Sequence, residues 1–107
     1  MKLPAAVRTA FDAVNSGDTD SFVRLFRPET GYISDWSDTF YGPAEIRKWS
    51  ERALIGKKVQ VKVLHYYAGD DDEVVVIAQD TARGNDRGMT FRFRLQDQHL
   101  SHMQVID

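Results

Sequence analysis

Apolar residues in the first part of the chain recur with the period of a helix. Val7, Ala10, Phe11 and Val14 follow the i, i+3, i+4, i+7 spacing of a helix that buries one face. The sequence therefore predicts a helix over residues 4–15, which the Ser-Gly pair that follows would end.

Two further helices are predicted before the pattern changes. Asp18 has the short polar side chain that caps helix N-termini, and Pro28 would end the helix that follows it. Pro43 fits the first turn of a third helix over residues 43–55. The predicted apolar stripe of this third helix consists of Ile46, Trp49 and Ala53.

After Gly56 the apolar period changes from 3.6 to 2, which is typical of strands with one buried face. Strands are predicted over residues 31–36, 59–67, 73–83, 89–95 and 99–106, with turns at 69–73, 84–88 and 96–98. Three helices combined with a long antiparallel meander predict an α+β fold whose sheet curls around the helices.

Composition narrows the class of protein without naming a function. A chain of 107 residues is expected to form a single domain over 1–107, and its net charge of −2 does not favour nucleic acid or an anionic membrane. Cysteine is absent, and we expect neither a metal site nor a cofactor. The N-terminus lacks the apolar core of a signal peptide, so we expect a cytoplasmic location.

Four segments in order resemble the NTF2-like superfamily, which includes SnoaL-like and ketosteroid-isomerase-like domains. They read "VNSGD", "FVRLFRPETGYISDW", "FYGPAEIRKW" and "MTFRFRLQDQHLSHMQVI". The resemblance implies an NTF2-like cone, with three N-terminal helices packed in a strongly curved antiparallel sheet and an apolar pocket in its mouth. Members of this superfamily include isomerases, cyclases, dehydratases and epoxide hydrolases, but many are non-catalytic binding or dimerisation modules, so the fold alone does not determine activity.

The resemblance places Asp35 where the ketosteroid-isomerase branch keeps its general base. A carboxylate moved from water into an apolar cavity becomes a stronger base, as that chemistry requires. The alternative is a structural aspartate near the rim, solvated or hydrogen-bonded to a serine or a tryptophan N–H. Ala10 and Phe91 stand where that branch keeps its oxyanion hole, so we do not expect steroid isomerisation.

Two other polar residues are candidates for the same pocket. His65 reads inward with Val61 and Val63, so it is a candidate acid–base partner of Asp35, or else a core histidine. Asp80 is a candidate for the pocket mouth, or else a solvated residue at the end of a strand. The predicted ligand pocket consists of Phe11, Phe26, Trp36, Phe40, Trp49, Asp80, Phe91 and Met103.

The outward-reading side chains of the sheet predict a homodimer that packs through this sheet. Arg92 and Arg94 alternate with buried phenylalanines and so read outward. Further apolar area on the same face is predicted from Leu64, Tyr66, Leu100 and Ile106. Monomers rarely expose such patches.

Three functions are consistent with these residues. The first is a protein that binds an unidentified hydrophobic or aromatic small molecule in its cone. The second is an isomerase, cyclase or dehydratase with Asp35 as general base and His65 as partner. The third is a dimerisation module whose pocket is filled by its own side chains.

Overall fold

The computed structural model describes residues 2–36, 38–82 and 87–106. In these residues it has three helices, which are α1 (Ala5–Ser16), α2 (Thr19–Arg24) and α3 (Gly42–Ala53). The same ranges contain six strands, which are β1 (Tyr32–Asp35), β2 (Asp38–Tyr41), β3 (Val61–Ala68), β4 (Glu73–Asp80), β5 (Arg87–Gln96) and β6 (His99–Ile106). No helix in the described ranges is long and apolar enough to cross a membrane.

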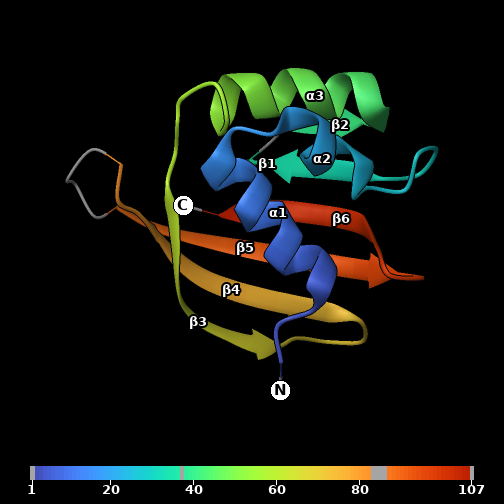
Figure 1. Cartoon of the computed structure of the whole chain (residues 1–107). Coiled ribbons are helices and arrows are strands. Elements are labelled where there is room, and N and C mark those ends of the chain that lie inside the picture. Colours follow the sequence, from blue (N-terminus) through green and yellow to red (C-terminus); the bar gives the residue numbers. More distant parts are fainter. Residues whose placement is uncertain (1, 37, 83–86, 107) are drawn as a thin grey trace.

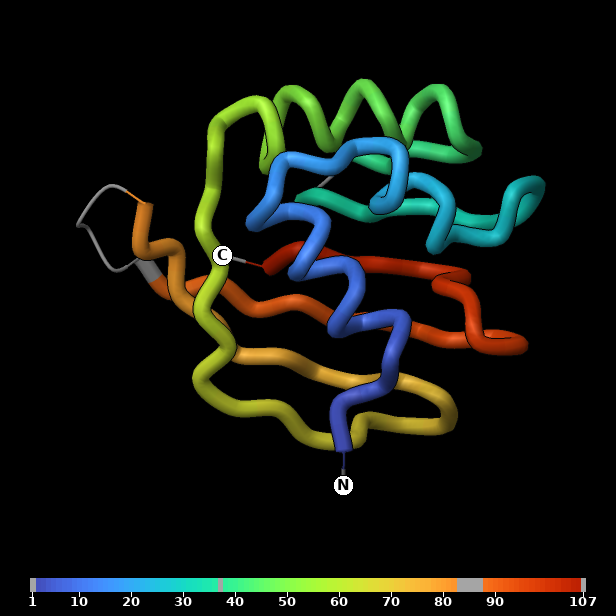
Figure 2. Tube along the Cα trace, in the orientation of Figure 1, coloured from blue at the N-terminus to red at the C-terminus, as the bar shows by residue number. Residues whose placement is uncertain are grey.

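The strands form one curved sheet with the order β2-β1-β6-β5-β4-β3. Figure 1 shows the helices on one side of this sheet, with α3 beside β2 and α1 in front of β6 and β5. The α+β cone predicted from the sequence is thus confirmed. Figure 2 traces residues 54–60, which run from the end of α3 to the opposite edge of the sheet, where β3 begins.

Two details of the sheet differ from the prediction. The chain that approaches α3 forms an additional strand, β2, which pairs with β1 as an antiparallel hairpin. In addition β1 lies parallel to β6, so the sheet is not antiparallel throughout. The predicted turn at 84–88 falls mostly outside the described residues.

Local sequence signals account for the connection between α1 and α2. Gly17 ends α1 in a left-handed conformation with φ of 74°, which glycine adopts without steric cost. Asp18 then caps α2, because its side chain accepts hydrogen bonds from the Ser21 amide at 3.1 Å and the Ser21 hydroxyl at 2.7 Å. Both bonds favour the charged carboxylate and lower the pKa of Asp18 below its ordinary value.

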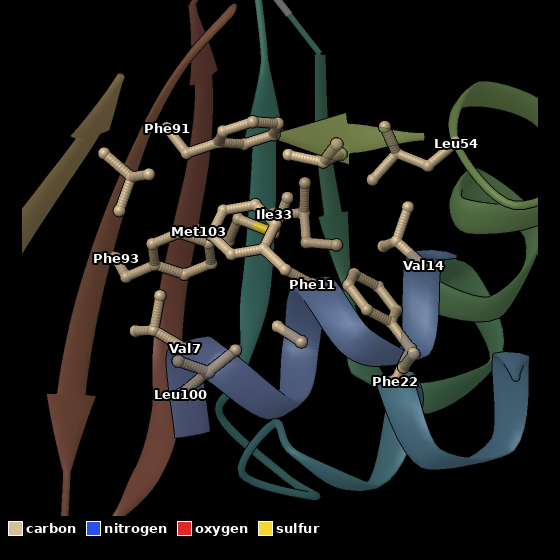
Figure 3. Close-up of a cluster of buried hydrophobic side chains, with 14 of the residues drawn as sticks. Val7, Phe11, Val14, Phe22, Ile33, Leu54, Phe91, Phe93, Leu100 and Met103 are labelled. Atoms are coloured by element: carbon tan, nitrogen blue, oxygen red, sulfur yellow. The ribbon is translucent and has the colours of Figure 1, made fainter. Parts of the chain in front are cut away.

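The space between the helices and the sheet is filled with apolar side chains. Figure 3 shows Phe11 and Phe22 from the helices, and Phe91, Phe93 and Met103 from the strands, converging on one cluster. The ring of Phe11 meets Phe91 and Phe93 edge to face, with centroids 5.3 and 5.6 Å apart. This packing confirms the helical core face predicted for α1.

A β-bulge in β3 reverses the predicted direction of its side chains. Val63 pairs with Ala78, but His65 pairs with Ile77, so Leu64 has no partner opposite it. An extra residue shifts a period-2 pattern by one position and exchanges the two faces of the strand. His65 is therefore exposed, and its predicted inward placement is wrong. Tyr66, predicted to point outward, instead packs against the core.

A second irregularity has the same effect between β5 and β6. Arg94 pairs with His102 and Leu95 with Leu100, which leaves Ser101 unmatched. Leu100 is consequently fully buried, so its predicted exposure on the outer face of the sheet is also wrong. Arg92 and Arg94 are exposed as predicted, and both lie within 4 Å of the Glu73 carboxylate.

Candidate functional site

A pocket of about 340 Å³ lies at the end of the molecule where β1, β4 and β6 end. Its wall also includes the C-terminal part of α3, the connection to β3 and the start of β5. The lining residues are Asp35, Trp36, Trp49, Ala53, Leu54, Lys57, Val59, Asp80, Met89 and Val105. We call this space the mouth pocket.

Asp35 is held in the mouth pocket by a hydrogen bond from α3. The indole Nε1–H of Trp49 donates to Asp35 Oδ2 at 2.9 Å, and the Trp49 side chain is 1% exposed. Asp35 itself is half-buried at the last position of β1. Asp35 therefore lines a pocket and also accepts a hydrogen bond from a tryptophan N–H.

Asp80 lines the same pocket from the end of β4. Its Oδ1 accepts the backbone N–H groups of Gln60 at 3.3 Å and Ala82 at 3.0 Å. These bonds join the ends of β3 and β4 and keep the carboxylate at the pocket wall. The pocket thus contains two aspartates from different strands, together with the cationic Lys57.

The interior of the cone is closed. Phe11, Phe91 and Met103 were predicted to line a ligand pocket, but they surround a space that does not admit a water-sized sphere. Ala10 borders the same packed region, and Phe91 is fully buried. The three residues are core residues, and open space is found at the mouth instead.

Two other predicted pocket residues lie outside the mouth pocket. Phe26 borders a separate groove of about 180 Å³ between α2 and the start of α3. Phe40 packs beside Trp49, with ring centroids 6.4 Å apart, and the guanidinium of Arg52 lies over its ring at 5.3 Å. Trp36, Trp49 and Asp80 are the other predicted residues that line the mouth pocket with Asp35.

The outer face of the sheet carries a polar and aromatic cluster that the sequence did not indicate. The imidazole of His102 stacks on Tyr32 with centroids 4.2 Å apart, and His102 Nε2 lies 2.9 Å from Ser34 Oγ. Burial and then the nearby Arg94 guanidinium lower the pKa of His102, with Glu73 acting in the opposite direction. These contacts depend on the register between β1 and β6, which alternation along one strand does not reveal.

Another hollow lies at the opposite end of the sheet. A wider depression of about 540 Å³ lies between the β3–β4 and β5–β6 turns and is more open to solvent. Its wall includes Asp71, Asp72 and Asp97 but no aromatic side chain. No group of three or more metal-binding side chains is found among the residues that the structure describes.

Comparison with known proteins gives one family and several similar structures. A model of the SnoaL-like domain matches residues 7–103. The search of curated proteins gives no match. A Sinorhizobium meliloti protein provisionally described as a polyketide cyclase is 24% identical with a TM-score of 0.82, over 97% of this chain and 95% of that one.

Two other solved structures have the same fold. SalBIII, described as an epoxide hydrolase/cyclase-like enzyme, is 24% identical with a TM-score of 0.74, over 94% of this chain and 86% of its own. A ketosteroid isomerase-like protein from Catenulispora acidiphila, in complex with trimethylamine, is 18% identical with a TM-score of 0.78, over 99% of this chain and 87% of its own. At these identities the likeness establishes the fold alone.

Proposed function

The chain belongs to the SnoaL-like domain family, and from that premise we propose that it binds a small molecule in the mouth pocket, with Asp35 as polar anchor. The observation that carries the proposal is the hydrogen bond from Trp49 to Asp35 at the wall of a 340 Å³ pocket. The volume of the mouth pocket falls within the range of small-molecule sites, which begins at about 300 Å³.

The bond from Trp49 orients the carboxylate toward a ligand. Of the two carboxylate oxygens of Asp35, only Oδ2 accepts a hydrogen bond from a residue that the structure describes. Oδ1 therefore has capacity to accept an O–H or N–H from a bound molecule. The closed interior restricts such a molecule to the mouth, where Met89 and Val105 supply apolar contact.

The proposal is tested by titrating hydroxylated and aromatic fragments into the ¹⁵N-labelled protein. Fragments that bind should shift the indole signals of Trp36 and Trp49. Loss of a hydrogen bond to a charged group costs about 1.5–3 kcal/mol, so Asp35→Asn should weaken binding by at least about tenfold.

Asp38→Asn is the matched control, because it removes the same charge from the adjacent strand at an exposed position outside the pocket. Its affinities should equal those of the wild type. Equal affinities for Asp35→Asn and the wild type, or signal shifts confined to the depression at the opposite end of the sheet, would overturn the proposal.

A second candidate is proton-transfer catalysis of the isomerase, cyclase or dehydratase type. The specific observation in its favour is that Asp35 and Asp80 line one pocket, so one carboxyl can accept a proton while the other donates one. Relatives by fold include proteins described as cyclase-like. His65 has no part in this scheme, because it lies exposed outside the pocket.

Turnover distinguishes this enzyme from a binding protein. With a substrate found by fragment binding, Asp35→Asn and Asp80→Asn should each abolish turnover while the fold persists. Undiminished turnover in Asp35→Asn would exclude it as the general base.

We also propose a homodimer packed through the outer face of the sheet. Large apolar side chains remain exposed at Leu64, Tyr67 and Ile106, with exposed fractions of 52%, 46% and 37%. Sedimentation equilibrium should show a dimer that Tyr67→Lys dissociates. A wild-type protein that stays monomeric at millimolar concentration would contradict this arrangement.

A further inference from the structure

Trp36 occupies a position in the β1–β2 hairpin that suits a different residue. Asp35 pairs with Asp38, so the loop between the two strands has two residues, of which Trp36 is the first. Its φ is 55°, in the left-handed region. Two-residue hairpin loops favour glycine and asparagine at such positions, because bulky side chains crowd the backbone there.

Hydration also disfavours tryptophan at this position. The Trp36 side chain is 78% exposed, more than any other large apolar side chain in the described residues. The other tryptophan, Trp49, is 1% exposed and donates its indole N–H to Asp35. Neither backbone preference nor burial therefore explains an indole at position 36.

The surroundings of Trp36 give a reason for the indole. Its side chain lines the mouth pocket immediately beside Asp35. It also borders a groove of about 320 Å³ with Gln104, Val105 and Ile106 of β6. Trp36 and Val105 thus lie between the mouth pocket and this groove.

We propose that Trp36 is a ligand-contact residue whose indole covers a molecule held by Asp35, and that this contact keeps tryptophan in an unfavourable turn position. The inference rests on the proposed binding function and adds a requirement on the ligand. The ligand presents a flat π face to the indole and an O–H or N–H to Asp35. Proteins often keep a strained backbone conformation at a binding residue, where it lowers the stability of the fold but serves binding.

Two measurements on Trp36→Asn test the inference, and both use the full chain. The first is the thermal midpoint without ligand, which should rise by about 4–8 °C because asparagine adopts a positive φ with less strain than tryptophan. The second is binding of 2-naphthol, followed through the Trp49 indole signal. Loss of stacking should weaken it by about three- to tenfold.

Decahydro-2-naphthol keeps the hydroxyl but lacks the aromatic plane, so its affinity should be nearly equal in the wild type and Trp36→Asn. Tyr41→Thr removes another exposed aromatic that does not line the mouth pocket and should leave 2-naphthol binding unchanged. A thermal midpoint that falls in Trp36→Asn, or unchanged 2-naphthol binding, would overturn the inference.

Other outcomes separate this inference from the proposed function. Binding weakened by Asp35→Asn but not by Trp36→Asn would leave the proposed function standing and overturn the role of Trp36. Loss of self-association in Trp36→Asn with unchanged binding would assign the indole to a second copy of the chain instead. Failure of both compounds to bind the wild type would overturn the proposed function and this inference with it.

Discussion

Trp49→Phe tests whether the indole of α3 holds Asp35 in place. The substitution keeps an aromatic ring in the core but removes the N–H that donates to Asp35 Oδ2 at 2.9 Å. A hydrogen bond to a charged group contributes about 1.5–3 kcal/mol, and the lower half of that range applies because Asp35 is half-buried. The smaller ring at a site only 1% exposed costs about 1–2 kcal/mol more.

The expected loss in the free energy of unfolding is therefore about 2.5–4 kcal/mol. Urea unfolding followed by circular dichroism measures it without relying on tryptophan fluorescence, which the substitution changes. A double-mutant cycle with Asp35→Ala separates the hydrogen bond from the loss of packing. We expect a coupling energy of about 1–2 kcal/mol between the two positions. A coupling energy near zero would show that the bond does not stabilise the fold, and would refute the reasoning.

Three other predictions concern the cap, the core and the outer face. Asp18→Ala should lower the thermal midpoint at neutral pH. Because Ser21 lowers the pKa of Asp18 in the folded state, the wild type loses this stabilisation as the pH falls below 3.8, whereas the variant has none to lose. Phe93→Ala should cost about 3–5 kcal/mol in urea unfolding, since its ring is fully buried against Phe11; a loss below about 1 kcal/mol would contradict the packing. Burial lowers the pKa of His102 below 6.5, so the unfolded chain takes up its proton first and stability falls as pH drops below 6.5. His102→Phe should flatten that part of the pH profile, and an unchanged slope would argue against the assignment.

The helices and most strands follow from patterns within single segments. The apolar face of α1 and the Asp18 cap each depend on residues a few positions apart, so sequence reasoning finds them. The faces of β3 and β6 depend instead on two bulges, one at Leu64 in β3 and one at Ser101 in β6. Each bulge reverses a period-2 pattern, and no residue in either strand marks the reversal.

The candidate site could be predicted only in part from the sequence. Asp35 and Asp80 end two strands and Trp49 lies on α3, and the resemblance to the NTF2-like superfamily supplies the arrangement that brings these elements together. Whether Phe11 and Phe91 enclose a cavity depends on how closely their rings pack, and side-chain volumes alone do not determine this. The strain at Trp36 depends on hairpin register, which only the structure gives.

Crystallographic fragment soaking tests the central claim most directly. The claim is that a ligand binds at the mouth of the cone against Asp35, outside the closed core. The account predicts fragment density in the mouth pocket, with an O–H or N–H donor within hydrogen-bond distance of the Asp35 carboxylate. Fragments bound between Phe11 and Phe91, or bound elsewhere with the mouth pocket empty, would contradict it.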